Sequence, residues 1–240
     1  MLMRHEPLKP TMDEAVSALA ARLARRLKAV EGTICCAESC TGGLLSSTLT
    51  DLSGASSWYR QSWITYTNEA KVSHLGVKES TLEKHGAVSS EVAMEMAEGA
   101  RLRAGTTLAI SITGIAGPKA DDSQKPVGLV YVGISTADGK RSKQARFGGS
   151  RQDNKESFVT FALQMAIDQW DFLRDKDARK EAEANQRMEQ QRILEEEKRL
   201  KRLVAEAKAK ADAPWQEQDW SDSSRDRDIG GDVEWGDSSP

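Results

Sequence analysis

The segment Ala37-Glu38-Ser39-Cys40-Thr41-Gly42-Gly43 combines hydroxyl and thiol side chains with two consecutive glycines. It follows a short apolar run, residues 33–37, whose lack of alternation is typical of a strand covered on both faces. Glycine lets the backbone turn tightly, and the first N–H groups of a following helix have no partner inside that helix. We therefore expect Ser39 to be a nucleophile on a strand-to-helix turn, with free amides of the turn and helix facing the reacting group. An ordinary helix cap that uses glycine for the turn explains the same residues, and local chemistry leaves both interpretations open.

A serine nucleophile needs a base, and the three histidines of the chain show no spacing that indicates a Ser-His-Asp arrangement. The other candidate is Lys71, in the segment Tyr66-Thr67-Asn68-Glu69-Ala70-Lys71. A lysine can act as a base only if its pKa falls from about 10.4 by roughly three units, which requires burial or a positive neighbour. Tyr66 would then hydrogen-bond the lysine or relay a proton. A solvated lysine on a short helix is the plainer interpretation, and Cys40 is a weaker nucleophile because neither a histidine nor a second thiol is placed to activate it.

A second glycine-rich loop, Thr113-Gly114-Ile115-Ala116-Gly117-Pro118, follows another apolar run. In an open α/β sheet, ligands bind at the carboxyl ends of the strands, where both this loop and the Ser39 turn are expected to lie. Two such turns indicate one shared pocket, with Thr113, Gly114 and Gly117 among its binding residues. Arg151 is a candidate anion clamp because a planar guanidinium suits phosphate, although a surface charge in the first turn of a helix is the alternative.

The elements that must position these residues alternate between helical and strand patterns. Helices are expected from Thr11, which is a good N-cap, to Gly32, over residues 43–49, over 68–75, from 89 to about 105, and after Gly148-Gly149-Ser150. Strands are expected at 33–37, 58–66, 107–113 and 127–135, with an Asp138-Gly139 hairpin leading to a strand that ends at Phe147. This order predicts a three-layer α/β/α sandwich with a mixed, mostly parallel sheet.

Charge and composition divide the 240-residue chain into regions. Residues 1–173 carry 20 basic and 19 acidic side chains, residues 174–211 carry 12 and 9, and residues 212–240 carry 2 and 9. Residues 1–173 are therefore almost neutral, which gives no electrostatic reason to expect a nucleic-acid ligand. No apolar stretch is long enough to span a membrane, and the first residues do not resemble a secretory signal. Three cysteines within six residues, without a second ligand cluster, favour a reduced, cytoplasmic setting and no metal site.

The sequence pattern divides the chain into four segments. Residues 1–11 form a short N-terminal extension, and residues 12–173 form the expected domain. Residues 174–211 contain neither glycine nor proline and predict a long charged helix, which is either a single solvated helix or a weak coiled-coil seam. Residues 212–240 have the composition of a disordered acidic tail, and their three tryptophans indicate either a short partner-binding motif or an inert tail.

The motifs at 37–43, 66–71 and 113–118, together with His85-Gly86-Ala87-Val88-Ser89 and Lys125-Pro126-Val127-Gly128, resemble the CinA C-terminal domain family. The resemblance covers about residues 12–173. It implies a cofactor-independent Ser/Lys amidohydrolase that converts nicotinamide mononucleotide to nicotinate mononucleotide and ammonia, as a homodimer. By motif, Ser39 would be the nucleophile and Lys71 its base, assisted by Tyr66. The binding residues that it implies, together with those of the two turns, are Thr41, Gly42, Gly43, Thr113, Gly114, Gly117 and Arg151.

Two departures from the family pattern bear on this expectation. The loop after Pro118 reads Lys119-Ala120-Asp121-Asp122, with Gln124 further on, where the family has glycines and an acid. Because that loop borders the expected pocket, the departure affects substrate identity more than reaction type. The alternative function is a non-catalytic interaction protein that keeps the fold and acts through its C-terminal helix and tail.

Overall fold

A computed structural model describes residues 12–119 and 124–212 of the chain. The elements along these residues are α1 (Met12–Lys28), β1 (Ile34–Glu38), α2 (Leu44–Thr50), the 3-10 helix η1 (Ala55–Ser57), β2 (Tyr59–Ile64), α3 (Asn68–Leu75), α4 (Glu79–His85), α5 (Ser90–Ala104), β3 (Leu108–Gly114), β4 (Leu129–Thr136), β5 (Gly139–Arg146) and α6 (Arg151–Asp212).

The strands form one sheet in the order β2-β1-β3-β4-β5. β1 pairs in parallel with β2 and with β3, whereas β4 is antiparallel to both β3 and β5. Every strand of this sheet except β4 therefore runs in the same direction, which confirms the predicted mixed, mostly parallel sheet. The hairpin predicted at Asp138-Gly139 is also confirmed, because β4 and β5 pair directly across it.

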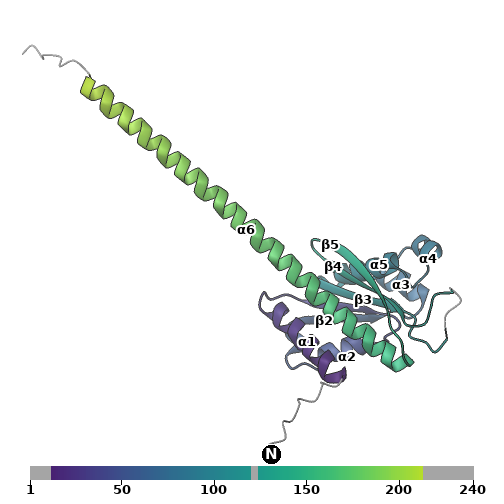
Figure 1. Ribbon diagram of the computed structural model, residues 1–240. Coiled ribbons are helices and arrows are strands. Elements are labelled where there is room, and N and C mark those ends of the chain that lie inside the picture. Colours follow the sequence, from purple (N-terminus) through teal and green to yellow (C-terminus); the bar gives the residue numbers. More distant parts are fainter. Residues whose placement is uncertain (1–11, 120–123, 213–240) are drawn as a thin grey trace, which may run out of the picture. The chain divides into compact units, whose positions relative to one another are not determined.

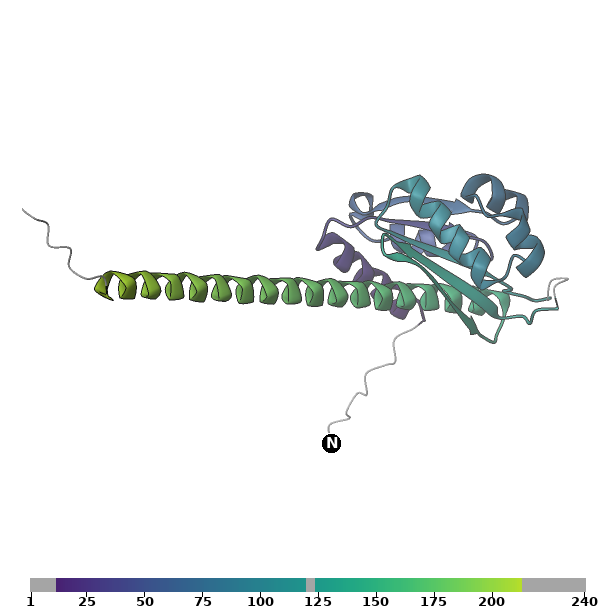
Figure 2. The same cartoon turned by 90° about the horizontal axis from the view of Figure 1, so that it is seen from above.

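Helices cover both faces of the sheet, as expected for three layers (Figure 1). α1, α2 and the N-terminal part of α6 pack on one face, and α3, α4 and α5 pack on the other; Figure 2 shows the same arrangement from above. Side chains of β1 alternate between the two cores, with Ile34 and Cys36 in the first and Cys35 and Ala37 in the second. All four side chains are fully buried, so the strand predicted to be covered on both faces is confirmed.

One close approach between helices supports the element that carries Lys71. A Cβ atom on Gly99 of α5 would lie 1.8 Å from the carbonyl oxygen of Leu75, the last residue of α3. Only glycine fits at this point, and its absence of a side chain lets α5 pack directly against the end of α3. Leu75 and Met96 are buried together in the same core, which holds α3 against the sheet.

The sequence predicted no element between residues 76 and 89, where the structure has α4. This helix has seven residues and only Leu82 packs against a core, so it lacks the apolar periodicity that would reveal it. The proposed cap Thr11, the N-terminal extension, Ala120-Asp121-Asp122 and the tryptophan-bearing tail lie outside the described residues.

The last helix is continuous from Arg151 to Asp212, which confirms the predicted helical extension. Its side chains from 174 to 210 are all exposed. The chain divides into one compact unit that ends at Arg179 and a second that begins at Lys180. The domain boundary expected at residue 173 stays a prediction. Among the described residues, no helix combines the length and the apolar character that crossing a membrane requires.

Candidate active site

Ser39 follows the last residue of β1 at the carboxyl edge of the sheet. Its backbone N–H donates to the carbonyl oxygen of Ile112 in β3, so the turn begins while still attached to the sheet. Gly42 and Gly43 then have φ angles of 62° and 99°, a region that favours glycine, and α2 starts at the next residue. The predicted strand-to-helix turn is confirmed, and Ser39 within it is 8% exposed.

The topology opens a crevice beside this turn. The chain leaves β1 toward α2 on one face of the sheet and leaves the parallel neighbour β2 toward α3 on the opposite face. Connections that diverge in this way leave space at the carboxyl ends of the strands, where α/β proteins bind ligands. Ser39 from the first connection and Lys71 from the second both line the pocket found there.

The first amides of α2 are already occupied. The carboxylate of Glu38 accepts hydrogen bonds from the backbone N–H groups of Gly43, Leu45 and Ser46 at 2.8–3.1 Å. The expectation that free helix amides would face a substrate is therefore wrong at these positions. The physical reason is that a buried carboxylate from the strand end satisfies the N–H groups that a helix leaves unpaired.

The binding residues predicted within this turn make contacts inside the protein, and their role in binding stays a prediction. Thr41 is fully buried and its hydroxyl donates to Glu38 Oε2, while the Gly42 amide donates to the Ser39 carbonyl oxygen. Thr41, Gly42 and Gly43 are absent from the described lining of the pocket beside Ser39. Within the described part of the chain, the Thr41 amide has no acceptor and the Cys40 amide has only its own thiol, so these two amides are the remaining candidates for an oxyanion hole.

Lys71 reaches Ser39 from the second turn of α3. That helix begins after Thr67, whose side chain accepts from the Ala70 amide as an N-cap. Lys71 is 1% exposed, and its Nζ lies 3.2 Å from Ser39 Oγ and 3.0 Å from the carbonyl oxygen of Thr65. The sequence could not show that the two residues meet; the structure brings them within hydrogen-bond distance across 32 positions.

Burial changes the acidity of this lysine. Desolvation lowers the pKa of Lys71 to about 8, against an opposing attraction from the Glu69 carboxylate. At pH 7 about a tenth of such a group is unprotonated, which is enough for a general base at neutral pH. The alternative of a solvated surface lysine does not fit a side chain with 1% exposure.

Cys40 lines the same pocket, but it is not poised as a nucleophile. Burial raises the pKa of its thiol to about 12, so the thiol stays protonated near neutral pH. A protonated thiol is a poor nucleophile, which agrees with the preference for Ser39 reached from the sequence.

The hydroxyl of Tyr66 is directed to a different partner from the one expected. It accepts a hydrogen bond from Arg151 Nη2 at 3.0 Å, whereas Lys71 Nζ contacts only the backbone carbonyl oxygen of Tyr66, at 3.4 Å. The structure therefore pairs the tyrosine hydroxyl with Arg151 and not, as expected, with Lys71. Tyr66 is 58% exposed because it stands at the pocket rim with Arg151.

The second glycine-rich loop is held from two directions. Thr113 is 1% exposed and its hydroxyl donates to the carbonyl oxygen of Ala87. On the other side, Arg151 Nη1 donates to the carbonyl oxygen of Gly117, and Asn154 Nδ2 donates to that of Ala116 at 3.0 Å. The first turns of α6 thus fix the loop, a role that sequence reasoning missed for the fully buried Asn154.

These groups line one pocket of about 290 Å³. This volume is near the lower end of the roughly 300–1,000 Å³ typical of small-molecule sites. Asn68 lines it and was missed by sequence reasoning, whereas Lys119 comes from the loop that was expected to border the pocket. The full lining is Ser39, Cys40, Tyr66, Asn68, Lys71, Ala87, Val88, Thr113, Gly114, Ile115, Ala116, Gly117, Lys119 and Arg151.

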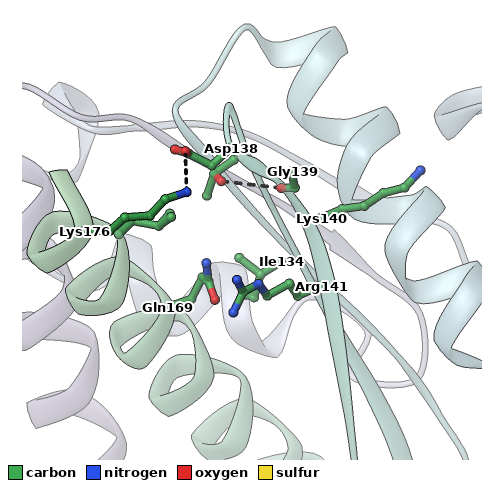
Figure 3. A pocket seen from close by; sticks show the side chains of 9 residues that line it. Ile134, Asp138, Gly139, Lys140, Arg141, Gln169 and Lys176 are labelled. Atoms are coloured by element: carbon green, nitrogen blue, oxygen red, sulfur yellow. Dashed lines mark hydrogen bonds and ion pairs between the residues drawn. The ribbon is translucent and has the colours of Figure 1, made fainter. Parts of the chain in front are cut away.

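A smaller cavity of about 80 Å³ lies at the β4–β5 hairpin and the facing side of α6 (Figure 3). Its charged groups are engaged with one another or with neighbours: Lys176 pairs with Asp138 at 3.5 Å, and Lys140 pairs with Glu98. These contacts hold the hairpin, whereas the Ser39 pocket brings a hydroxyl to an amine of lowered pKa. The Ser39 pocket is therefore the candidate active site.

A comparison with models of known protein families identifies the family of this chain. The model of the CinA C-terminal domain matches residues 16–170. The chain belongs to the CinA C-terminal domain family. This CinA domain is 36% identical to the crystal structure of the competence/damage inducible protein CihA from Agrobacterium tumefaciens, with a TM-score of 0.62, covering 68% of this chain and 98% of that one.

Two relatives of this CinA domain differ in how much of their own length it matches. The nicotinamide-nucleotide amidohydrolase PncC of Enterobacter agglomerans is 43% identical over 150 residues, which cover 62% of this chain and 92% of that protein. The CinA-like protein of Syntrophomonas wolfei is 47% identical over 156 residues, which cover 65% of this chain. The chain spans only 36% of the length of that second relative.

Proposed function

We propose that this protein hydrolyses the carboxamide of nicotinamide mononucleotide to give nicotinate mononucleotide and ammonia. The observation that carries the proposal is the buried Lys71 Nζ, 3.2 Å from Ser39 Oγ. A relative that is covered over 92% of its length has the name nicotinamide-nucleotide amidohydrolase, which supports the same reaction class.

In the proposed first step, unprotonated Lys71 accepts the hydroxyl proton of Ser39 as the oxygen attacks the carboxamide carbon. The carbonyl oxygen gains negative charge, which the Cys40 and Thr41 amides would stabilise. The C–N bond then breaks, the proton on Lys71 passes to the leaving nitrogen, and ammonia departs. A Ser39 ester of the nicotinate nucleotide remains.

In the second step, Lys71 takes a proton from a water molecule that attacks the ester carbon. The ester bond breaks, Ser39 regains its proton from Lys71, and the carboxylic acid product leaves. The sum is one amide and one water converted to one acid and one ammonia, without a cofactor. Because Lys71 both accepts and donates a proton in each step, its lowered pKa serves both directions.

The remaining pocket residues suit a nucleotide phosphate. Arg151 and Lys119 bring positive charge to the pocket lining, and Tyr66 holds the guanidinium of Arg151 by its hydroxyl. Arginine binds phosphate oxygens through its planar fork of N–H donors. We assign Arg151 and Tyr66 to phosphate recognition, with Thr113, Gly114 and Gly117 as further lining residues of the same pocket.

Release of ammonia from nicotinamide mononucleotide by the purified full chain tests the function. Ser39→Ala and Lys71→Ala should each remove the activity. Activity that survives Ser39→Ala contradicts the mechanism, and a wild-type chain that hydrolyses no pyridine nucleotide contradicts the function.

A second role, self-association through α6, is favoured by a separate observation. Ile193, Leu200, Leu203 and Val204 are 48–63% exposed and lie on one side of the helix. The neighbouring run of three glutamates, 195–197, is followed directly by four basic residues within 198–202. In an antiparallel pair of these helices, the acidic run of one copy would lie along the basic run of the other. The occupant that we propose for this stripe is therefore a second copy of the chain.

A further inference from the structure

Glu38 is a charged side chain with no exposed surface, and it directly precedes Ser39. Its carboxylate accepts five hydrogen bonds. The donors are the Thr41 hydroxyl, the amides of Gly43, Leu45 and Ser46, and the Ser46 hydroxyl. Burying a carboxylate is unfavourable unless hydrogen bonds and favourable charge replace its water. The five donors and the positive end of α2 supply that replacement.

These contacts fix the conformation of the turn that carries Ser39. Glu38 Oε2 joins the middle of the turn, at Thr41 and Gly43, to the first turn of α2 at Leu45. Oε1 holds Ser46, whose hydroxyl lies 2.6 Å from the hydroxyl of Ser62 in β2. The carboxylate thus connects strand, turn, helix and neighbouring strand around one point.

The main chain of Glu38 also reaches the lysine side of the site. Its carbonyl oxygen accepts from the Thr65 amide at 2.8 Å, and the Thr65 carbonyl oxygen accepts from Lys71 Nζ at 3.0 Å. Ser39 is the next residue along the chain. One residue therefore holds the nucleophile through its side chain and supports the partner of the base through its backbone.

We propose that Glu38 is a positioning residue that holds Ser39 and the Cys40 and Thr41 amides in their reactive geometry. It lies outside the described lining of the pocket and acts only through the residues that it holds. This inference rests on the proposed function only in its kinetic test, which needs the amidohydrolase activity. It also assigns the N-terminus of α2 to an internal carboxylate, so the phosphate of a substrate must bind elsewhere, at Arg151.

The variant Glu38→Gln tests the proposal because it keeps the shape of the side chain but can accept at only one of its two terminal atoms. We expect kcat to fall on the order of 100-fold, the loss that a displacement of about 1 Å produces, while KM changes less than about twofold. The pH at half-maximal activity should stay unchanged, because the backbone link to Thr65 and Lys71 remains. Ser46→Ala, which removes one hydroxyl donor, should give a smaller loss, and the surface control Glu98→Gln should give none.

A merely structural role predicts a different result. Glu38→Gln would then lower the folded fraction and the melting temperature, while kcat per folded molecule stayed at the wild-type value. That outcome, or a fall in kcat matched by Glu98→Gln, overturns the proposal. The folded fraction is measured by circular dichroism on the same samples that are used for kinetics.

Amide hydrogen exchange separates this proposal from the proposed function. A glutamine keeps one acceptor oxygen, so Glu38→Gln removes the acceptor either of the Gly43 and Leu45 amides, held by Oε2, or of the Ser46 amide, held by Oε1. The amides that lose their acceptor should exchange at least about tenfold faster, whereas the Ser47 amide keeps its bond to the Gly43 carbonyl oxygen. Unchanged exchange at the first three amides contradicts the role of Glu38 even if the enzyme is active. If the wild-type chain releases no ammonia, the function fails, and faster exchange still supports the holding of the turn.

Discussion

Lys71 Nζ lies 3.2 Å from Ser39 Oγ, although the two residues come from different connections on opposite faces of the sheet. The lysine is buried, its pKa is lowered to about 8, and the carbonyl oxygen of Thr65 accepts a second hydrogen bond from it. A hydroxyl and an amine in this relationship form the minimum set for acyl transfer by a serine. Substituting Ser39 or Lys71 therefore tests the proposed chemistry.

Ser39→Ala should lower the rate of ammonia release by at least about 1,000-fold, because it removes the atom that forms the ester. The matched control is Cys40→Ala, one position along the same turn, which should keep the rate within a few-fold because the thiol is protonated. Steady-state ammonia release by the full-length variants makes the comparison. A Cys40→Ala variant as inactive as Ser39→Ala would show that the thiol takes part.

The pH dependence follows from the pKa of Lys71. The base works only when unprotonated, so kcat/KM should rise about tenfold per pH unit below pH 7 and level off above about pH 8.5. Lys71→Arg keeps the charge but cannot lose its proton, and it should be inactive throughout. A wild-type profile that is flat between pH 6 and 9 would contradict Lys71 as the base.

Much of this arrangement could be predicted from the sequence, because the relevant signals are local. Glycines after apolar runs indicated both turns, and the helix from Asn68 to Leu75 ends at Gly76 as expected. The proximity of Lys71 and Ser39 could not be predicted from the sequence, since it depends on how α3 packs against α5. The role of Glu38 was also missed. An acid before a strand-to-helix turn could have indicated it, because the helix amides there need an acceptor.

Stability should show the cost of burying Lys71. Its pKa is about 8 in the folded chain and about 10.4 when unfolded, so the unfolded state binds more protons between these values. The free energy of unfolding therefore rises as the pH increases through about 8 toward about 10.4, because the folded chain loses the proton of Lys71 first. Between pH 7 and 9, the free energy of unfolding of the wild type should gain about 1 kcal/mol relative to Lys71→Met.

Urea unfolding of both proteins at pH 7 and pH 9 measures this difference. Other groups that titrate in the range are common to the two proteins, so their contributions cancel in the comparison. An equal change with pH in both proteins would show that the lysine has an ordinary pKa when folded.

Arg151 and Tyr66 should affect binding rather than chemistry. Arg151→Ala should raise KM by about 10- to 100-fold, as expected for a charge-assisted hydrogen bond to phosphate, and Tyr66→Phe should raise it only a few-fold. In both variants, kcat and the pH midpoint should stay close to the wild-type values. A Tyr66→Phe variant that loses kcat would instead restore the proton-relay role expected from the sequence. Lys155→Ala, on the same helix but outside the pocket lining, is the control.

The exposed stripe on α6 should govern assembly of the full chain. A double variant, Leu200→Glu with Leu203→Glu, places two acidic groups on the stripe and should lower the sedimentation coefficient relative to the wild type. Ala205→Glu adds a charge to the opposite side of the same exposed helix and should leave assembly unchanged. Because the stripe lies more than 40 positions after Arg151, the double variant should keep its ammonia release per folded chain. Identical sedimentation of the wild type and the double variant would contradict self-association through α6.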